Sequence, residues 1–237
     1  MIGVKPKSYP AQNKKKKWSY DGDNGPQNWG DLSADYLSCE VGLNQSPVDF
    51  SKSFSSPDLH SIRFNYGISA GRVYLARGSI TFKVIPGNVA YFKGKQWVLE
   101  RVVLRTPSEH SIEGHSFDGE LQLYHSYKGE SFLWVSVLLE AGSALKPFRQ
   151  IVDKAKGISG ASKLMGVDLR LLIPRRKNYY FYPGSDTIPP CKEGRSWVVL
   201  RQPVGASIKY IEHLESQVGK GARPTQPLYA RVPLRYD

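Results

Sequence analysis

Alternation of apolar and polar residues dominates the chain between residues 60 and 140, where turn residues separate short segments. Successive side chains of a strand face opposite sides of a sheet, so this pattern predicts strands. RSWVVLRQPV (195–204) is more uniformly apolar and is predicted to be a central strand. The alternating segments are SIRFNYG (61–67), RVYLARG (72–78), SITFKVIPGN (79–88), VAYFKGKQWVLERVVLR (89–105), ELQLYHSY (120–127) and SFLWVSVLLEAG (131–142).

Two segments have the spacing of a helix instead. They are KPFRQIVDKAKGI (146–158) and GASIKYIEHLESQVGK (205–220). WSYDGDNGPQNWGDL (18–32) is rich in Gly, Asn and Asp, and we expect irregular structure with buried aromatic residues there. No internal repeat or linker divides the chain. We therefore predict an α+β, mostly β fold with peripheral helices, in which residues 1–17 form a basic flexible arm and residues 18–237 a single domain.

The charge of the chain favours an anionic partner. Lys and Arg number 33 against 21 Asp and Glu, for a net charge of +12. The expected partner is a sulfated glycan, an anionic membrane surface, an acidic protein face or a larger protein complex. Nucleic acid is less favoured, because aromatic residues do not interleave with the basic ones. The candidate contacts are Lys14, Lys15, Lys16, Lys17, Arg170, Arg175, Arg176 and Lys177.

The sequence shows neither a transmembrane segment nor a secretory signal. No apolar run reaches the roughly 18 residues of a transmembrane segment. No secretory apolar region follows Met1, so we expect that any targeting segment was removed or never present. The two cysteines, Cys39 and Cys191, lie far apart, and their spacing leaves open whether they are free thiols or one disulfide.

Residues 102–125, VVLRTPSEHSIEGHSFDGELQLYH, hold three of the five histidines beside carboxylates, as metal or acid–base sites often do. Several motifs here and elsewhere resemble the α-class carbonic anhydrases, in the same order and spacing from about residue 18 to 230. They are NGPQNWGDL (24–32), NQSPVDF (44–50), TPSEH (106–110), ELQLYH (120–125), YYFYPGSDTIPPC (179–191), SWVVL (196–200) and ARPTQPL (222–228). This resemblance implies a mainly antiparallel sheet of about ten strands with a cone-shaped cleft.

The resemblance also implies a disulfide between Cys39 and Cys191, which would place the protein in an oxidising compartment: secreted, periplasmic or in an organelle lumen. In the chain-entropy model a loop of this length contributes roughly 4 to 5 kcal/mol.

The family's catalytic zinc, held by three histidines, activates a water that attacks carbon dioxide. The positions that correspond to these histidines carry Val103, Arg105 and Gln122. Valine cannot bind a metal, and arginine brings a permanent positive charge. We therefore predict no metal or other cofactor, with Arg105 on the cleft floor paired to Glu120 or Glu109.

Other cleft positions differ as well. Tyr124, Trp134 and Arg195 stand where the family has small aliphatic residues, and Asp186 replaces a leucine, so these four are predicted to fill the pocket. Trp197 matches a family tryptophan. Thr187 and Glu109 match the pair that orients the zinc-bound hydroxide, and without that hydroxide we expect them to serve as buried hydrogen-bonding structure.

These substitutions lead to two hypotheses. The first is a non-catalytic binding or scaffold protein, without zinc or carbonic anhydrase activity, that uses a basic surface to engage an anionic partner or a larger assembly. The alternative is an enzyme with altered, zinc-independent chemistry, because carboxylates and arginines in a concave site can support acid–base reactions.

Overall fold

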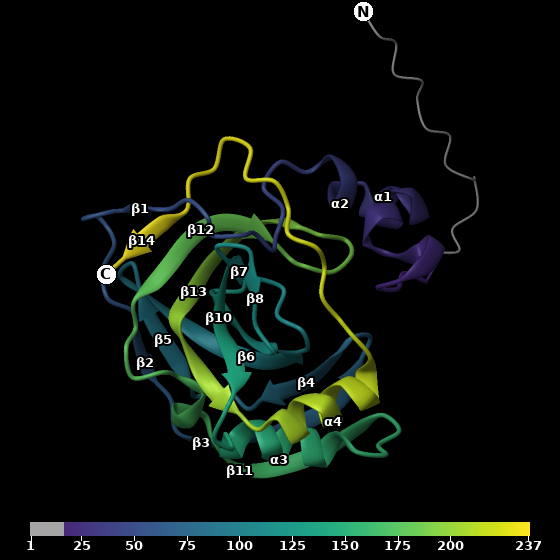
Figure 1. The fold of residues 1–237 in the computed structure, drawn as a ribbon. Helices are drawn as coiled ribbons and strands as arrows, with labels where there is room; N and C mark the ends of the chain where they lie inside the picture. The colour runs from purple at the N-terminus through teal and green to yellow at the C-terminus, as the bar shows by residue number, and fades with distance from the viewer. Residues whose placement is uncertain (1–16) are drawn as a thin grey trace, which may run out of the picture.

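A large twisted β-sheet runs through the computed structural model, which describes residues 17–237 (Figure 1). Its strands, with the small β7–β8 hairpin, are β1 Phe54–Ser55, β2 Arg63–Asn65, β3 Ile68–Ala76, β4 Ser79–Val84, β5 Val89–Phe92, β6 Lys95–Arg105, β7 Ser111–Ile112, β8 His115–Ser116, β9 Gly119–Tyr127, β10 Ser131–Ala141, β11 Ala161–Asp168, β12 Tyr179–Ser185, β13 Glu193–Ala206 and β14 Leu234–Tyr236. The helices are α1 Trp29–Leu32, α2 Ser38–Val41, α3 Lys146–Ala155 and α4 Ile208–Val218, with short 3-10 turns at Gly22–Asn24, Pro26–Asn28, Ala34–Tyr36 and Leu169–Leu172.

The main sheet has 12 strands in the order β1-β14-β12-β13-β10-β9-β6-β4-β3-β11, with β5 on β6 and β2 on β5. Within the described residues its strand pairs are antiparallel except β1 with β14 and β10 with β13. The predicted mostly β fold with a mainly antiparallel central sheet is confirmed. β13, predicted to be central, lies between β12 and β10.

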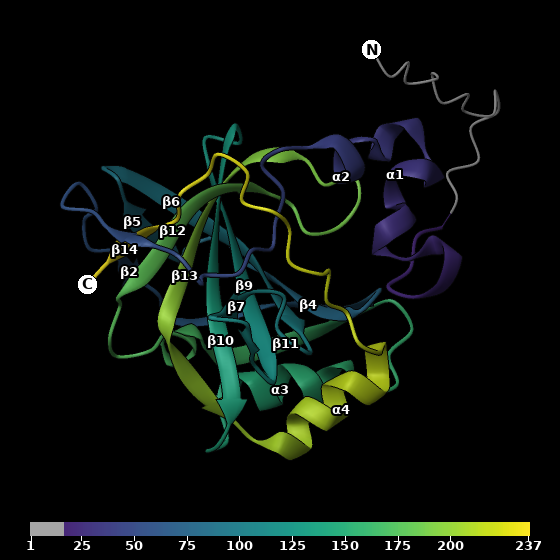
Figure 2. The ribbon, with the colours of Figure 1, turned by 45° about the horizontal axis from the view of Figure 1, so that its top comes forward.

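Alternation along the strands separates two faces of the sheet. On β9, Leu121 and Leu123 enter the larger apolar core, while Gln122 and Tyr124 face the other way. Helices α3 and α4 cover the first face (Figure 2). Phe148 of α3 is 1% exposed in this core, as its helical spacing predicts.

The second face carries the cleft. A smaller cluster built from Val103, Tyr124, Trp134 and Trp197 with neighbouring aromatic residues lies there. The segment that contains α1 and α2 packs at the edge of this region, where Trp29 is fully buried, as expected for its aromatic residues.

Several element boundaries differ from the prediction. The segment 89–105 forms two strands, because Lys93 and Gly94 both adopt left-handed backbone conformations and turn the chain between β5 and β6. The pattern did not identify β11 as a strand. No helix in residues 17–237 is long and apolar enough to cross a membrane. The arm at 1–17 lies almost wholly outside the described residues, and the single domain over 18–237 remains a prediction.

Candidate functional site: a cleft with arginine at its floor

Two neighbouring strands place the three implied ligand positions together. Val103 and Arg105 are two residues apart on β6 and share a face, and Val103 pairs in register with Gln122 on β9. All three side chains are buried. One face of the sheet therefore brings together an aliphatic group, a guanidinium and an amide.

Arg105 is the centre of a buried hydrogen-bond network. Its Nε donates to Gln122 Oε1 at 3.1 Å and lies 3.1 Å from Glu109 Oε2. Its Nη1 donates to Tyr20 Oη at 2.6 Å and to the Gly221 carbonyl at 2.9 Å. Burial opposes the charged form, but the nearby Glu109 carboxylate and Tyr20 raise the pKa of Arg105 overall. Of the two predicted pairings, the one with Glu109 is observed.

Glu109 gathers donors from distant parts of the chain. Its Oε2 accepts hydrogen bonds from Thr187 Oγ1 and Gln122 Nε2, both at 2.6 Å. Its Oε1 accepts from the backbone N–H of Arg223 at 3.0 Å. Thr187 and Glu109 are thus both buried members of one hydrogen-bond network.

Glu120 is hydrogen-bonded to the loop that carries Glu109 and His110. Its Oε2 accepts the backbone N–H groups of Glu109 and His110 at 2.9 Å, and its Oε1 lies 2.8 Å from His110 Nδ1. Burial alone would raise the pKa of Glu120, but its contacts with His110 outweigh that effect and lower the pKa to about 2. The carboxylate therefore holds the TPSEH loop against the sheet in its ionised form.

The chemistry of these side chains does not fit the zinc ion that the resemblance implies. Val103 offers no donor atom, and the Arg105 guanidinium has no free lone pair. The amide oxygen of Gln122 already accepts from Arg105. In residues 17–237 no group of three or more His, Cys, Asp or Glu residues is placed to hold a metal ion.

An aromatic row crosses the cleft face of the sheet. Tyr124 pairs in register with Trp134, and Trp134 with Trp197. The rings of Tyr124 and Trp134 meet edge to face at 4.6 Å, and those of Trp134 and Trp197 stack at 5.4 Å. Tyr124 and Trp134 thus pack together in the smaller apolar cluster, and Trp134 also lines the cleft cavity.

Asp186 and Arg195 neutralise each other. Arg195 Nε and Nη2 donate to the two Asp186 carboxylate oxygens at 2.9 and 2.8 Å. Trp134 Nε1 donates to the same carboxylate at 3.1 Å. A bidentate pair of this kind fixes both side chains, of which Asp186 lines the cleft cavity.

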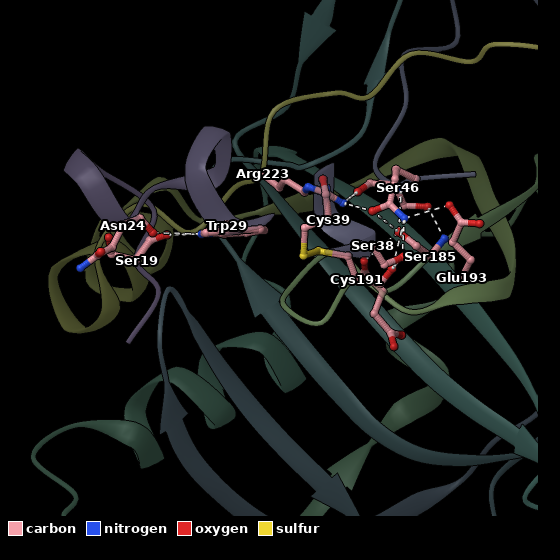
Figure 3. The surroundings of a disulfide bond; sticks show 12 residues. Ser19, Asn24, Trp29, Ser38, Cys39, Ser46, Ser185, Cys191, Glu193 and Arg223 are labelled. Atoms are coloured by element: carbon pink, nitrogen blue, oxygen red, sulfur yellow. Dashed lines mark hydrogen bonds between the residues drawn. A yellow bond between two sulfur atoms is a disulfide. The ribbon is translucent and has the colours of Figure 1, made fainter. Parts of the chain in front are cut away.

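The Cys39–Cys191 disulfide is confirmed, and it ties α2 to the loop that follows β12 (Figure 3). Both cysteines are buried. Arg223 Nη2 donates to the Cys39 carbonyl at 2.8 Å, and Gln45 Nε2 to the Cys191 carbonyl at 3.1 Å. Disulfides persist in oxidising compartments, so this bond agrees with the predicted class of location.

Some residues of the site have no signal in the sequence pattern. Tyr20 reaches Arg105 across 85 positions of the chain, and burial raises the pKa of Tyr20 to about 12. Burial also lowers the pKa of Arg223 to about 10. Arg101, unlike Tyr20 and Arg223, could have been identified as a cleft residue from the sequence. It precedes Val103 by two positions on the same strand and so lies on the same face of the sheet.

The predicted basic contacts have different environments. Arg175, Arg176 and Lys177 are exposed in the loop before β12. Arg170 is exposed but forms a bidentate ion pair with Asp168, so its charge is compensated. Lys17 is exposed, whereas Lys14, Lys15 and Lys16 lie outside the described residues.

Comparison with known proteins identifies the family. The family model of the eukaryotic-type carbonic anhydrases matches residues 24–233. A carbonic anhydrase from Neisseria gonorrhoeae is 34% identical over 220 residues, which cover 91% of this chain and 86% of that protein. The chain therefore belongs to the eukaryotic-type carbonic anhydrase family.

Solved structures agree with this assignment. A hyperthermostable carbonic anhydrase from an active hydrothermal vent chimney superposes with a TM-score of 0.88 at 33% identity, covering 93% of this chain and 100% of that one. A dioscorin solved in complex with ascorbate has a TM-score of 0.88 at 27% identity, covering 94% of this chain and 98% of that one.

These relatives correct one prediction. The three substituted positions led us to expect that the protein is not an enzyme and that carbonic anhydrase activity is lost. That expectation is contradicted, because the chain matches proteins named carbonic anhydrase over more than nine-tenths of its length, in sequence and in fold. The inference of lost activity had rested on a few positions within a scaffold that is otherwise shared.

Proposed function

We propose that this member of the carbonic anhydrase family binds a sulfated glycan, a linear polyanion, through one basic surface. We call this surface the Arg201 band. It comprises Lys52, Arg175, Arg176, Lys177, Arg201 and Arg235.

The observation that carries the proposal is the position of Arg201 at the junction of two surface hollows. One, of about 360 Å³, is lined by Arg176, Asn178, Arg201 and Gln202. The other, of about 320 Å³, includes Lys52, Arg201 and Arg235 in its lining, with Glu113 as its acidic residue. Two hollows that share an arginine offer consecutive anion sites, which suits a polymer with regularly repeated charges.

Charge within the Arg201 band is only partly compensated. Asp237 pairs with both Arg201 and Arg235, at 2.5 and 2.9 Å. Arg176 and its two neighbours in the loop form no ion pair with a carboxylate of the described residues. Exposed guanidinium and ammonium groups of this kind form charge-assisted hydrogen bonds with sulfate.

We also infer that the Arg105 guanidinium takes the place of the family's zinc. The support is the chemistry of the residues, since the cation is permanent and is matched by Glu109 within 3.1 Å. A dioscorin of the same fold has been solved with bound ascorbate, which supports a binding role for this scaffold in at least one relative.

Retention on heparin tests the Arg201 band. Replacing the three loop cations together (R175Q/R176Q/K177Q) should lower the salt concentration needed for elution, because screened surface charges supply the attraction. The matched control is R72Q/K83Q/K163Q, which removes three exposed cations from neighbouring positions of β3, β4 and β11. The control should elute close to the unmodified protein.

Equal losses in the two variants would show that net charge alone causes retention and would refute a defined site. Stronger binding to anionic vesicles or to an acidic protein than to heparin would show that the partner is not a sulfated glycan.

For the cleft, metal analysis of the purified protein should find far less than one zinc per chain. A stoichiometric zinc ion would refute the role given to Arg105.

A further inference from the structure

A cavity of about 320 Å³ remains in the cleft despite the large side chains on its floor. Arginines 77, 101 and 105 contribute to its lining, and Asp186 is the single acidic residue among the described lining residues. This cleft cavity is separate in composition from the Arg201 band, since the two share no residue.

Two of these positive charges have no internal counter-charge. Asp186 is already held by both donors of Arg195, and Arg105 is matched by Glu109. Arg77 and Arg101, in contrast, form no ion pair with a carboxylate in residues 17–237. The lining of the cleft cavity therefore carries an excess of positive charge.

Aromatic stacking presents these two guanidinium groups for binding. The Arg101 guanidinium lies 3.7 Å from the centre of the Tyr124 ring and 5.4 Å from that of Trp134. The Arg77 guanidinium lies 5.3 Å from the centre of the Trp18 ring. A guanidinium over a ring face keeps its N–H edges available, and these edges match a carboxylate or sulfonate.

The rest of the lining is largely apolar and flat. Trp18, Trp134, Pro189 and Pro190 all contribute to it. A volume of roughly 300 Å³ is at the lower end for small-molecule sites, which are typically apolar with a few placed polar groups. Such a cavity suits a molecule the size of one substituted ring.

We propose that the cleft cavity binds a small organic anion. Its carboxylate or sulfonate group contacts Arg77 and Arg101, and its flat apolar body lies against Trp18 and Trp134. This site is additional to the Arg201 band and does not depend on it.

Benzoate is the probe that tests the proposal, with benzamide as its neutral analogue of the same shape. Calorimetric titration of the full chain, freed of metal by prior dialysis against a chelator, should show saturable binding of one benzoate per chain. The affinity for benzamide should be lower by at least about tenfold, because benzamide lacks the charge that the arginines recognise.

Variants locate the site. R101Q and R77Q should each weaken benzoate binding by about tenfold, and R101K should recover part of the affinity. R72Q is the matched control, since Arg72 is exposed on the same strand as Tyr74 but does not line the cavity. The loop variant R175Q/R176Q/K177Q should also leave benzoate binding unchanged, which separates this site from the glycan surface.

Three results would overturn the proposal: no saturable benzoate binding, equal affinity for benzamide, or unchanged affinity in both R101Q and R77Q. If inorganic sulfate binds as tightly as benzoate, the apolar part of the ligand does not contribute to affinity, and the proposal of an organic anion is wrong. R77Q changes an exposed side chain, so it remains informative even where R101Q lowers stability.

Discussion

Arg105 shows how much one residue can reorganise a site. A guanidinium carries its charge at every accessible pH and spreads its donors in a plane, so it can satisfy several acceptors at once. Here those acceptors come from Gln122, Tyr20 and the Gly221 carbonyl, with Glu109 alongside as counter-charge. The buried charges are thus matched within the protein itself.

Removing one member of this pair should be costly. We expect R105M to lower the free energy of unfolding by about 3–5 kcal/mol, because it leaves the Glu109 carboxylate buried without its cation. Urea denaturation measures this change. R101M, which removes a half-buried arginine without an ion pair, should cost only about 1 kcal/mol.

The double variant R105M/E109Q sharpens the test. It removes both charges, so its loss should be clearly smaller than the sum of the two single losses. Additive losses would mean that Arg105 and Glu109 do not stabilise each other, whatever their distance.

Sequence reasoning found the part of the site that lies on strands. The resemblance to the carbonic anhydrases located Val103, Arg105 and Gln122, because the family's ligand positions lie two apart on one strand and on the next strand. It could not find Tyr20 or the Gly221 carbonyl, which meet Arg105 across 85 and 116 positions of the chain. Such contacts depend on how loops close over the sheet, and no local pattern records that.

At the scale of elements, strong alternation predicted strands well and weak alternation did not. β9 and β10 are buried on both faces, and their patterns are clear. Among the described residues β11 pairs only with β3 at the sheet edge, and just one of its 8 residues is buried, so few of its side chains are under a packing constraint. Its sequence, ASKLMGVD, consequently resembles a loop.

The disulfide is the strongest link between two elements that no strand pairing joins. It connects α2 with the loop after β12 over a separation of 152 residues. The same loop supplies Thr187 and Pro189 to the cleft cavity. The bond therefore holds a wall of the cavity as well as the N-terminal helices.

Loss of this link should destabilise the chain. C39S/C191S should lower the free energy of unfolding by about 2–5 kcal/mol, because a long loop is no longer closed in the unfolded state. Urea denaturation of the variant, and of the unmodified protein under a reductant, should show the same loss. An unchanged unfolding midpoint in both samples would contradict the role of the bond.

At the scale of the whole molecule, a basic surface and a hydrogen-bonded interior coexist. The chain carries a net charge of +12, yet its buried ionic groups are paired or hydrogen-bonded, as for Arg105, Glu120 and Arg231. The surface charge governs association with anions, whereas the buried groups govern how stability depends on pH.

His125 is a buried group whose protonation affects stability in mild acid. Its Nδ1 faces the carbonyls of Leu123 and Leu133 and must donate to them, so its Nε2 accepts the Tyr66 hydroxyl at 2.6 Å. The ring is therefore neutral, and burial lowers the pKa of His125 from 6.5 to about 4. The unfolded chain takes up a proton in this range before the folded chain does.

Stability should therefore fall as pH decreases from 6.5 to 4, by about 3 kcal/mol from this residue. Glu120 adds a similar loss at lower pH, between 4.5 and 2, because its pKa in the folded state is also depressed. Urea denaturation at a series of pH values gives the profile of stability against pH.

Y66F/H125F, which removes both polar partners, should flatten this profile between pH 6.5 and 4. H60Q, at an exposed histidine, should leave the profile unchanged. A slope that persists in Y66F/H125F would assign the acid sensitivity to another group.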